Sequence, residues 1–98
     1  MIDIRYTDKF TYGELARVLI SFGLAERTGK TNLGIPYRAF SRESPDVIVM
    51  LPNVADSNKL EPIHLRRALR ALEDAGIADT SAFFQKLRQE EARDVKAA

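Results

Sequence analysis

The strongest constraint on the fold is a run of five apolar residues, Val47-Ile48-Val49-Met50-Leu51, which Pro52 ends. The short length and the β-branched residues favour a strand over a helix. Successive side chains of a strand point to opposite faces, so a strand that is apolar at every position should be covered on both. We therefore expect the C-terminal segment or a partner chain to cover the second face, with Ile48 or Met50 near that contact.

The length of the chain, 98 residues, suits one hydrophobic core. We therefore expect a single domain, 1–98, with its core over about residues 11–88. The absence of cysteine excludes disulfides and thiolate chemistry, and the single histidine, His64, excludes a histidine-rich metal site within one chain. Residues 1–10 lack the pattern of a signal peptide, and no apolar run matches a membrane span. These features predict a cytoplasmic protein without a metal or cofactor.

Local signals predict the first half of the fold. Thr11 and Glu14 form a T-x-x-E capping box before apolar residues at helical spacing, and Gly23 then predicts a helix end, so residues 11–22 are expected to be helical. Residues 37–42 alternate like a half-exposed strand. The segment 28–36 is rich in Gly, Asn, Thr and Pro, which predicts a turn or mobile loop. Residues 1–10 are expected to form an arm or short edge strand.

Two helices are predicted in the second half. Pro62 fits the first position of a helix with a leucine stripe, and Gly76 fits its end. A third helix is expected to start near Thr80, with Phe83 and Phe84 on its apolar stripe, and residues 90–98 are expected to fray. The order of elements predicts an α+β fold: a helix, a three-stranded antiparallel sheet, a helix and an additional C-terminal helix.

The clearest charge asymmetry lies between residues 27 and 42, which include four bases and no acid in a chain whose net charge is only +1. Aromatic residues alternate with these bases, as in surfaces that bind looped RNA. A solvated hairpin with one aromatic residue in the core is the alternative. The predicted RNA-binding residues are Arg27, Lys30, Tyr37, Arg38 and Arg42. If the bases face one groove, changing Arg38 and Arg42 to Glu should abolish weak, salt-sensitive binding and leave the fold intact.

Apolar residues predict a contact with another chain. Ile48 and Met50 would be exposed if the helices cover only one face of the sheet, and Phe83 and Phe84 form an apolar pair that suits a core or an interface. We therefore expect a homodimer or a tight complex, with all four residues as interface candidates. His64 is interpreted as a residue at the boundary of the core, with a general acid–base role as the alternative.

The run LPNVADSNKLEPIHLRRALRALEDAGI, residues 51–77, resembles the closing strand, loop and helix of HicA-like toxins from bacterial toxin–antitoxin pairs. The matching positions are Pro52, Leu60, Leu65, Arg66, Leu69, Ala75, Gly76 and Ile77, with Phe22, Gly23 and Leu24 in the front half. The resemblance covers about residues 11–88. It implies a fold like the double-stranded-RNA-binding domain, metal-free ribonuclease activity, and an antitoxin protein that covers the active surface.

The sequence departs from the family at the catalytic histidine, whose position is matched by Tyr37, with Phe40 as the aromatic residue three positions later. A tyrosine whose pKa is near ~10 is a poor general base at neutral pH. We therefore expect a HicA-like RNA-binding domain with weak or no cleavage. The alternatives are a protein-interaction module, such as a small subunit of a larger assembly, and a ribonuclease that uses Tyr37 or His64.

Overall fold

The computed structural model of the chain describes residues 10–97. The predicted N-terminal arm, apart from Phe10, lies outside the described residues. The elements are α1 (Tyr12–Ser21), β1 (Ala25–Lys30), β2 (Pro36–Arg42), β3 (Val47–Pro52), α2 (Pro62–Asp74) and α3 (Thr80–Ala97). Both strand pairs are antiparallel, in the order β1-β2-β3. The predicted α+β fold is confirmed.

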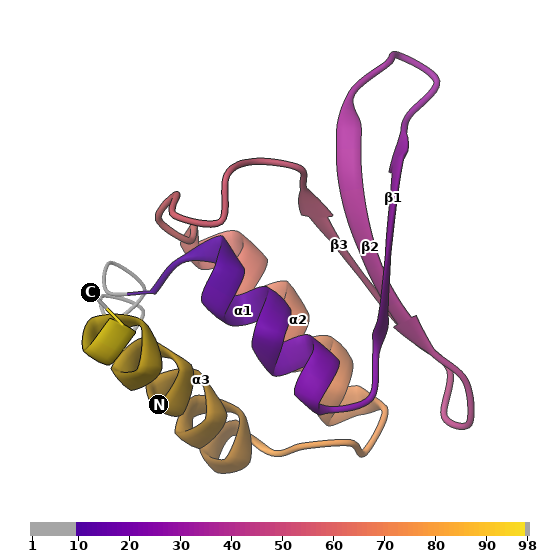
Figure 1. Cartoon of the computed structure of the whole chain (residues 1–98). Helices are drawn as coiled ribbons and strands as arrows, with labels where there is room; N and C mark the ends of the chain where they lie inside the picture. The colour runs from indigo at the N-terminus through magenta and orange to yellow at the C-terminus, as the bar shows by residue number, and fades with distance from the viewer. Residues whose placement is uncertain (1–9, 98) are drawn as a thin grey trace.

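The elements form three layers. Helices α1 and α2 pack against one face of the sheet, and α3 packs against α1 on the side away from the sheet (Figure 1). One continuous core joins the layers. Its largest fully buried side chains are Phe40, Phe83, Leu15, Leu19, Leu65, Leu72, Leu87 and Val18. All described helices therefore lie on the same side of the sheet.

The predicted helix signals are present in the structure. The Glu14 N–H donates to Thr11 Oγ1 at 3.2 Å, and the Thr11 N–H donates to Glu14 Oε1 at 2.8 Å, which completes the capping box. Pro62 occupies the start of α2. Past the end of that helix Gly76 takes φ +73°, and the Ile77 N–H donates to the Leu72 carbonyl at 2.9 Å.

The segment 28–36 is a loop only in its middle, so the predicted loop is too long at both ends. Strand β1 continues to Lys30, and only residues 31–35 connect it to β2. Gly29 pairs with Tyr37, and a Cβ built on Gly29 would lie 2.6 Å from the Tyr37 hydroxyl oxygen. The absent side chain therefore lets the tyrosine ring cross β1. Cross-strand packing overrides the local turn composition here.

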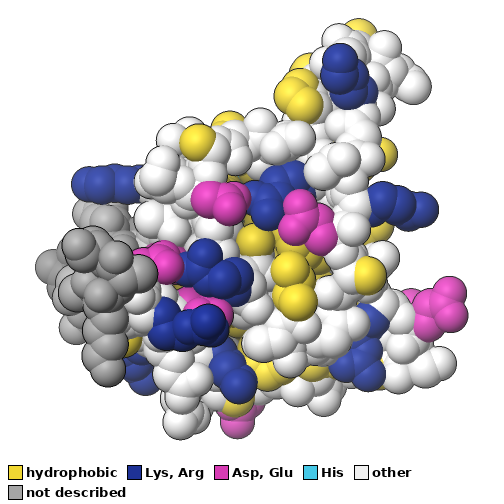
Figure 2. Space-filling view, viewed as in Figure 1, with side chains coloured by type: hydrophobic (Ala, Val, Ile, Leu, Met, Phe, Trp, Pro, Cys, Tyr) yellow, Lys and Arg dark blue, Asp and Glu magenta, His cyan; other side chains and the backbone are white. Residues whose placement is uncertain are grey.

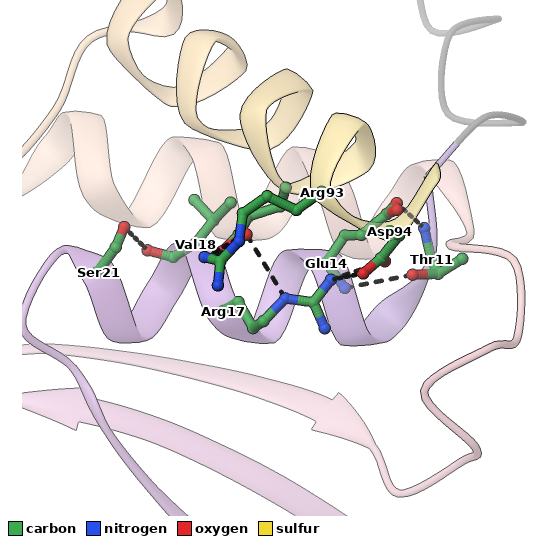
Figure 3. Close-up of polar contacts among 8 residues, drawn as sticks. Thr11, Glu14, Arg17, Val18, Ser21, Arg93 and Asp94 are labelled. Carbon is green, nitrogen blue, oxygen red and sulfur yellow. Dashed lines mark hydrogen bonds and ion pairs between the residues drawn. The ribbon is translucent and has the colours of Figure 1, made fainter. Parts of the chain in front are cut away.

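The C-terminal segment is helical through Ala97 and does not fray from residue 90 as predicted. Figure 3 shows Arg17 extending from α1 toward Asp94 of α3. One Arg17 nitrogen, Nη2, lies 2.7 Å from each carboxylate oxygen of Asp94, and Nε lies 3.6 Å from buried Glu90. These charged contacts hold the end of α3 on α1 where its apolar stripe has ended.

Glu14 at this helix contact should make stability depend on pH. Burial raises the pKa of Glu14, with a further contribution from the Asp94 carboxylate. The folded protein therefore binds the proton of the Glu14 carboxyl more tightly than the unfolded chain does. The stability contributed by this protonation is present at low pH and is lost as pH rises through the pKa of Glu14 in the folded protein. Glutamine also completes a capping box. We expect Glu14→Gln to melt at a higher temperature than wild type near pH 8, with the difference shrinking toward about pH 4.

Thermal melts followed by circular dichroism across this pH range check the expectation. Glu14→Ala is the matched control, because it removes the cap as well as the charge and should lower the melting temperature throughout. A Glu14→Gln protein that is less stable than wild type near pH 8 would contradict it.

Candidate functional site

The candidate site is the open face of the sheet, opposite α1 and α2 (Figure 1). Directly paired residues of an antiparallel sheet share a face. The register therefore places alternate residues of the three strands together on the open face. They are Ala25, Arg27, Gly29, Tyr37, Ala39, Ser41, Ile48, Met50 and Pro52.

The open face exposes two large apolar side chains of β3. Ile48 is 58% exposed and Met50 is 47% exposed, whereas their neighbours Val49 and Leu51 are buried under the helices. The apolar sequence of β3 predicted that both faces of this strand would be covered. Within residues 10–97 nothing covers the open face, because α3 packs on the helix layer instead. Of the two covers expected, the C-terminal segment or a partner chain, the first is therefore wrong for the described residues.

A single charged residue accompanies these apolar side chains. Among the described strand residues of the open face only Arg27 is charged, and it is exposed. Tyr37 lies half-buried with its hydroxyl over Gly29. The open face thus combines an exposed aliphatic pair with one aromatic and one basic side chain.

Two of the predicted RNA-binding bases, Arg38 and Arg42, lie on the helix side of the sheet. They alternate along β2 with the open-face residues and so share a face with buried Phe40. Arg38 is 9% exposed; its Nε donates to Glu26 at 2.9 Å and its Nη1 donates to Asp56 at 2.7 Å. The hydrogen bonds to Glu26 and then to Asp56 outweigh burial and raise the pKa of Arg38. The Arg42 Nη1 donates to a backbone carbonyl, that of Phe22, at 2.9 Å.

The four bases therefore do not face one groove. Alternation along the strands assigns Arg27 to the open face and the two β2 arginines to the helix side, where each is already hydrogen-bonded within the protein. The charge run that stood out in the sequence is divided by the pleat of the sheet. Acids outside the run, Glu26 and Asp56, neutralise part of it.

The β1–β2 hairpin projects beyond the body of the protein (Figure 1). Lys30 is exposed there, and Leu33 and Ile35 in the connection are 87% and 57% exposed. Figure 2 shows basic and hydrophobic side chains near the end of this hairpin. On the helix face in the same view, basic and acidic side chains are interspersed, which does not favour a phosphate-binding surface.

Phe83, predicted as a possible interface residue, is fully buried in the core and so is not available to a partner. Phe84 is partly buried and packs edge-on against Phe83, with ring centroids 5.7 Å apart. Phe83 is therefore a core residue and not an interface residue, because the apolar stripe of α3 packs against α1 and α2. Ile48 and Met50 are the two interface candidates that stay exposed.

Tyr12 and His64 form a polar pair that no sequence pattern predicted. The Tyr12 hydroxyl oxygen lies 2.7 Å from His64 Nδ1, and it accepts a hydrogen bond from the Glu61 N–H at 3.4 Å. Burial is the main cause that raises the pKa of Tyr12. The two residues are 52 positions apart, so no local pattern signals their contact. His64 lies on the helix side and Tyr37 on the open face, so they cannot act on one substrate atom together.

Comparison with known proteins identifies no relative: no family model, curated protein or solved structure matches the chain. Within the described residues, no cluster of three or more histidine or acidic side chains is arranged to hold a metal ion. No helix of the described part is both long and apolar enough to cross a membrane. The interpretation of the site therefore depends on its geometry.

Proposed function

We propose that this chain is a non-catalytic protein-binding module that binds a partner protein through the open face of its sheet. The observation that carries the proposal is the exposure of Ile48 and Met50 beside Tyr37, on a face with one charge. The largest exposed apolar patch on a monomeric protein, typically about 300–600 Å², is often functional. Interface cores are depleted in charge and enriched in Tyr, Met and Arg, which are residue types present here.

The resemblance to HicA-like toxins supports the same surface. In that family a neighbouring antitoxin covers the active surface, and the residue in the catalytic histidine's position here, Tyr37, belongs to the open face. Arg27 is the one charged group beside it among the described strand residues, so general acid–base chemistry has no second titratable group there. The partner that fits is a protein with an apolar surface and a carboxylate for Arg27.

The protein encoded by the reading frame adjacent to this gene is the first partner to test. Isothermal titration of that protein with the full chain should give saturable binding with a negative heat-capacity change, because apolar surface is buried. Absence of binding, or binding with no heat-capacity change, would contradict the proposal for this partner.

RNA binding at the hairpin is the second candidate function, and the exposure of Arg27 and Lys30 on a projecting element favours it. Two phosphate contacts to a single strand predict weak affinity with a salt slope of only about −1.4. We expect Arg27→Glu combined with Lys30→Glu to abolish a gel shift with single-stranded RNA. The double variant Arg66→Glu, Arg67→Glu on exposed α2 positions is the control and should retain it.

A further inference from the structure

The two edges of the sheet differ in their protection against pairing with another strand. Strand β1, at one edge, carries three charged residues, Glu26, Arg27 and Lys30, whereas β3, at the other, has no charged residue between Val47 and Pro52. Charges at an edge discourage further pairing, and a long apolar edge strand favours it. Within the described residues β3 pairs with β2 alone. The β3 edge is thus the one suited to accept another strand.

The hydrogen-bonding pattern shows which groups of β3 point outward. The Asn53 N–H donates to the Pro36 carbonyl at 3.4 Å, immediately beyond the Tyr37–Pro52 pair. Because hydrogen-bonded and non-hydrogen-bonded pairs alternate, Val49 and Leu51 are bonded to β2, and the N–H and C=O groups of Ile48 and Met50 point away from it. Pro52, next in that outward series, has no N–H, as is typical of an edge strand.

We propose that a second copy of this chain pairs antiparallel with β3 about a two-fold axis at Val49. In this register Ile48 lies opposite the partner's Met50, and Val47 lies opposite the partner's Leu51. The outward groups of Ile48 and Met50 can then make four backbone hydrogen bonds with the same groups of the partner. Each cross-strand pair is apolar, so the strand is complementary to itself.

Charge also favours the antiparallel two-fold arrangement with a second copy. The acids Glu43 and Asp46 lie in the turn at one end of β3. A parallel arrangement would place these carboxylates beside those of the partner, whereas the two-fold places them at opposite ends. The two open faces then form one side of a six-stranded sheet. This inference goes beyond the proposed function, because it uses the edge of β3 and leaves the open face available.

A single cysteine tests the register, since the chain has none of its own. At a non-hydrogen-bonded pair on the axis, the two Cα atoms lie about 4.5 Å apart, within the range of a disulfide. We expect mild oxidation to convert Val49→Cys mostly to a covalent dimer, although Val49 is buried. Ile48→Cys is the matched control: its side chain is far more exposed, but its copies are offset by two residues and should remain mostly monomeric.

Sedimentation equilibrium supplies the second measurement. Wild type should be dimeric at micromolar concentration, and Met50→Pro should weaken the dimer because it removes an outward N–H without breaking a bond to β2; circular dichroism verifies that this variant is folded. A monomeric wild type with no Val49→Cys cross-link would overturn the inference, as would equal cross-linking of Ile48→Cys. Either result leaves the proposed function intact if the adjacent-frame protein still binds, so the two failures are distinguishable.

Discussion

Arg38→Glu is expected to destabilise the folded protein strongly, although the sequence pattern alone predicts a tolerated change at an exposed RNA-binding position. Arg38 is buried between two carboxylates and lies over the Phe40 ring, with its guanidinium carbon 5.5 Å from the ring centroid. The substitution removes the cation and places a third carboxylate beside Glu26 and Asp56.

The expected size of this effect follows from burial. Breaking a buried ion pair costs about 3–5 kcal/mol, and the lower end applies here because Asp56 is well exposed. Small domains are stable by about 5–15 kcal/mol, so such a loss removes a large share of the total. Arg38→Lys should have a smaller effect, because it keeps the positive charge between the two carboxylates. It should still destabilise the protein, because an ammonium cannot hold both carboxylates with a planar fork.

Urea unfolding followed by circular dichroism measures the effect. Arg27→Glu is the matched control, since it makes the same charge change on the open face of the same sheet and should alter stability by no more than about 0.5 kcal/mol. An Arg38→Glu protein with the unfolding midpoint of wild type would contradict the structure of this ion-pair cluster.

Loss of partner binding is the second large effect that we expect. Ile48→Lys combined with Met50→Lys places two ammonium groups on the open face and removes both exposed apolar side chains. Full burial of one exposed side chain of this kind contributes about 1.5–3 kcal/mol, and about half of each side chain is still available for burial. Losing both should therefore cost about 1.5–3 kcal/mol, or roughly 10–100-fold in Kd. The fold should be retained, because both side chains are about half exposed and neither belongs to the buried core.

Ile63→Lys is the control for this pair. Ile63 is 42% exposed on α2, on the opposite side of the sheet, so the same chemical change is made away from the proposed surface. Titration calorimetry with the adjacent-frame protein should give wild-type affinity for this control. Equal losses in both variants would indicate a general effect of added charge and would contradict the open face as the binding surface.

The parts of the fold that the sequence predicts are those encoded by neighbouring residues. The Thr11–Glu14 capping box, Pro62 at a helix start and Gly76 past a helix end each act within one turn, and all three are present in the structure. Strand β1 could not be predicted from local sequence, because glycine at position 29 is typical of a turn. Its place in a strand depends on its contact with Tyr37 of the neighbouring strand. The end of α3 likewise depends on contacts with Arg17, far away in the sequence.

The candidate site could also be predicted only where it depends on residues that are neighbours in the sequence. The exposure of Ile48 and Met50 follows from alternation in a strand that helices cover on one side only. The basic run could not reveal that Arg38 binds Glu26 and Asp56, since Asp56 comes from the loop after β3. A charge run in the sequence indicates a charged surface only when all its members lie on one face.

The most direct test of the open face as the protein-binding surface is a methyl NMR titration with the adjacent-frame protein. With methionine and isoleucine methyl groups labelled, we expect the Met50 and Ile48 resonances to shift or broaden as partner is added, while the Ile63 resonance stays in place. Saturable binding that shifts the Ile63 resonance and leaves the Met50 and Ile48 resonances unchanged would contradict the open face as the binding surface.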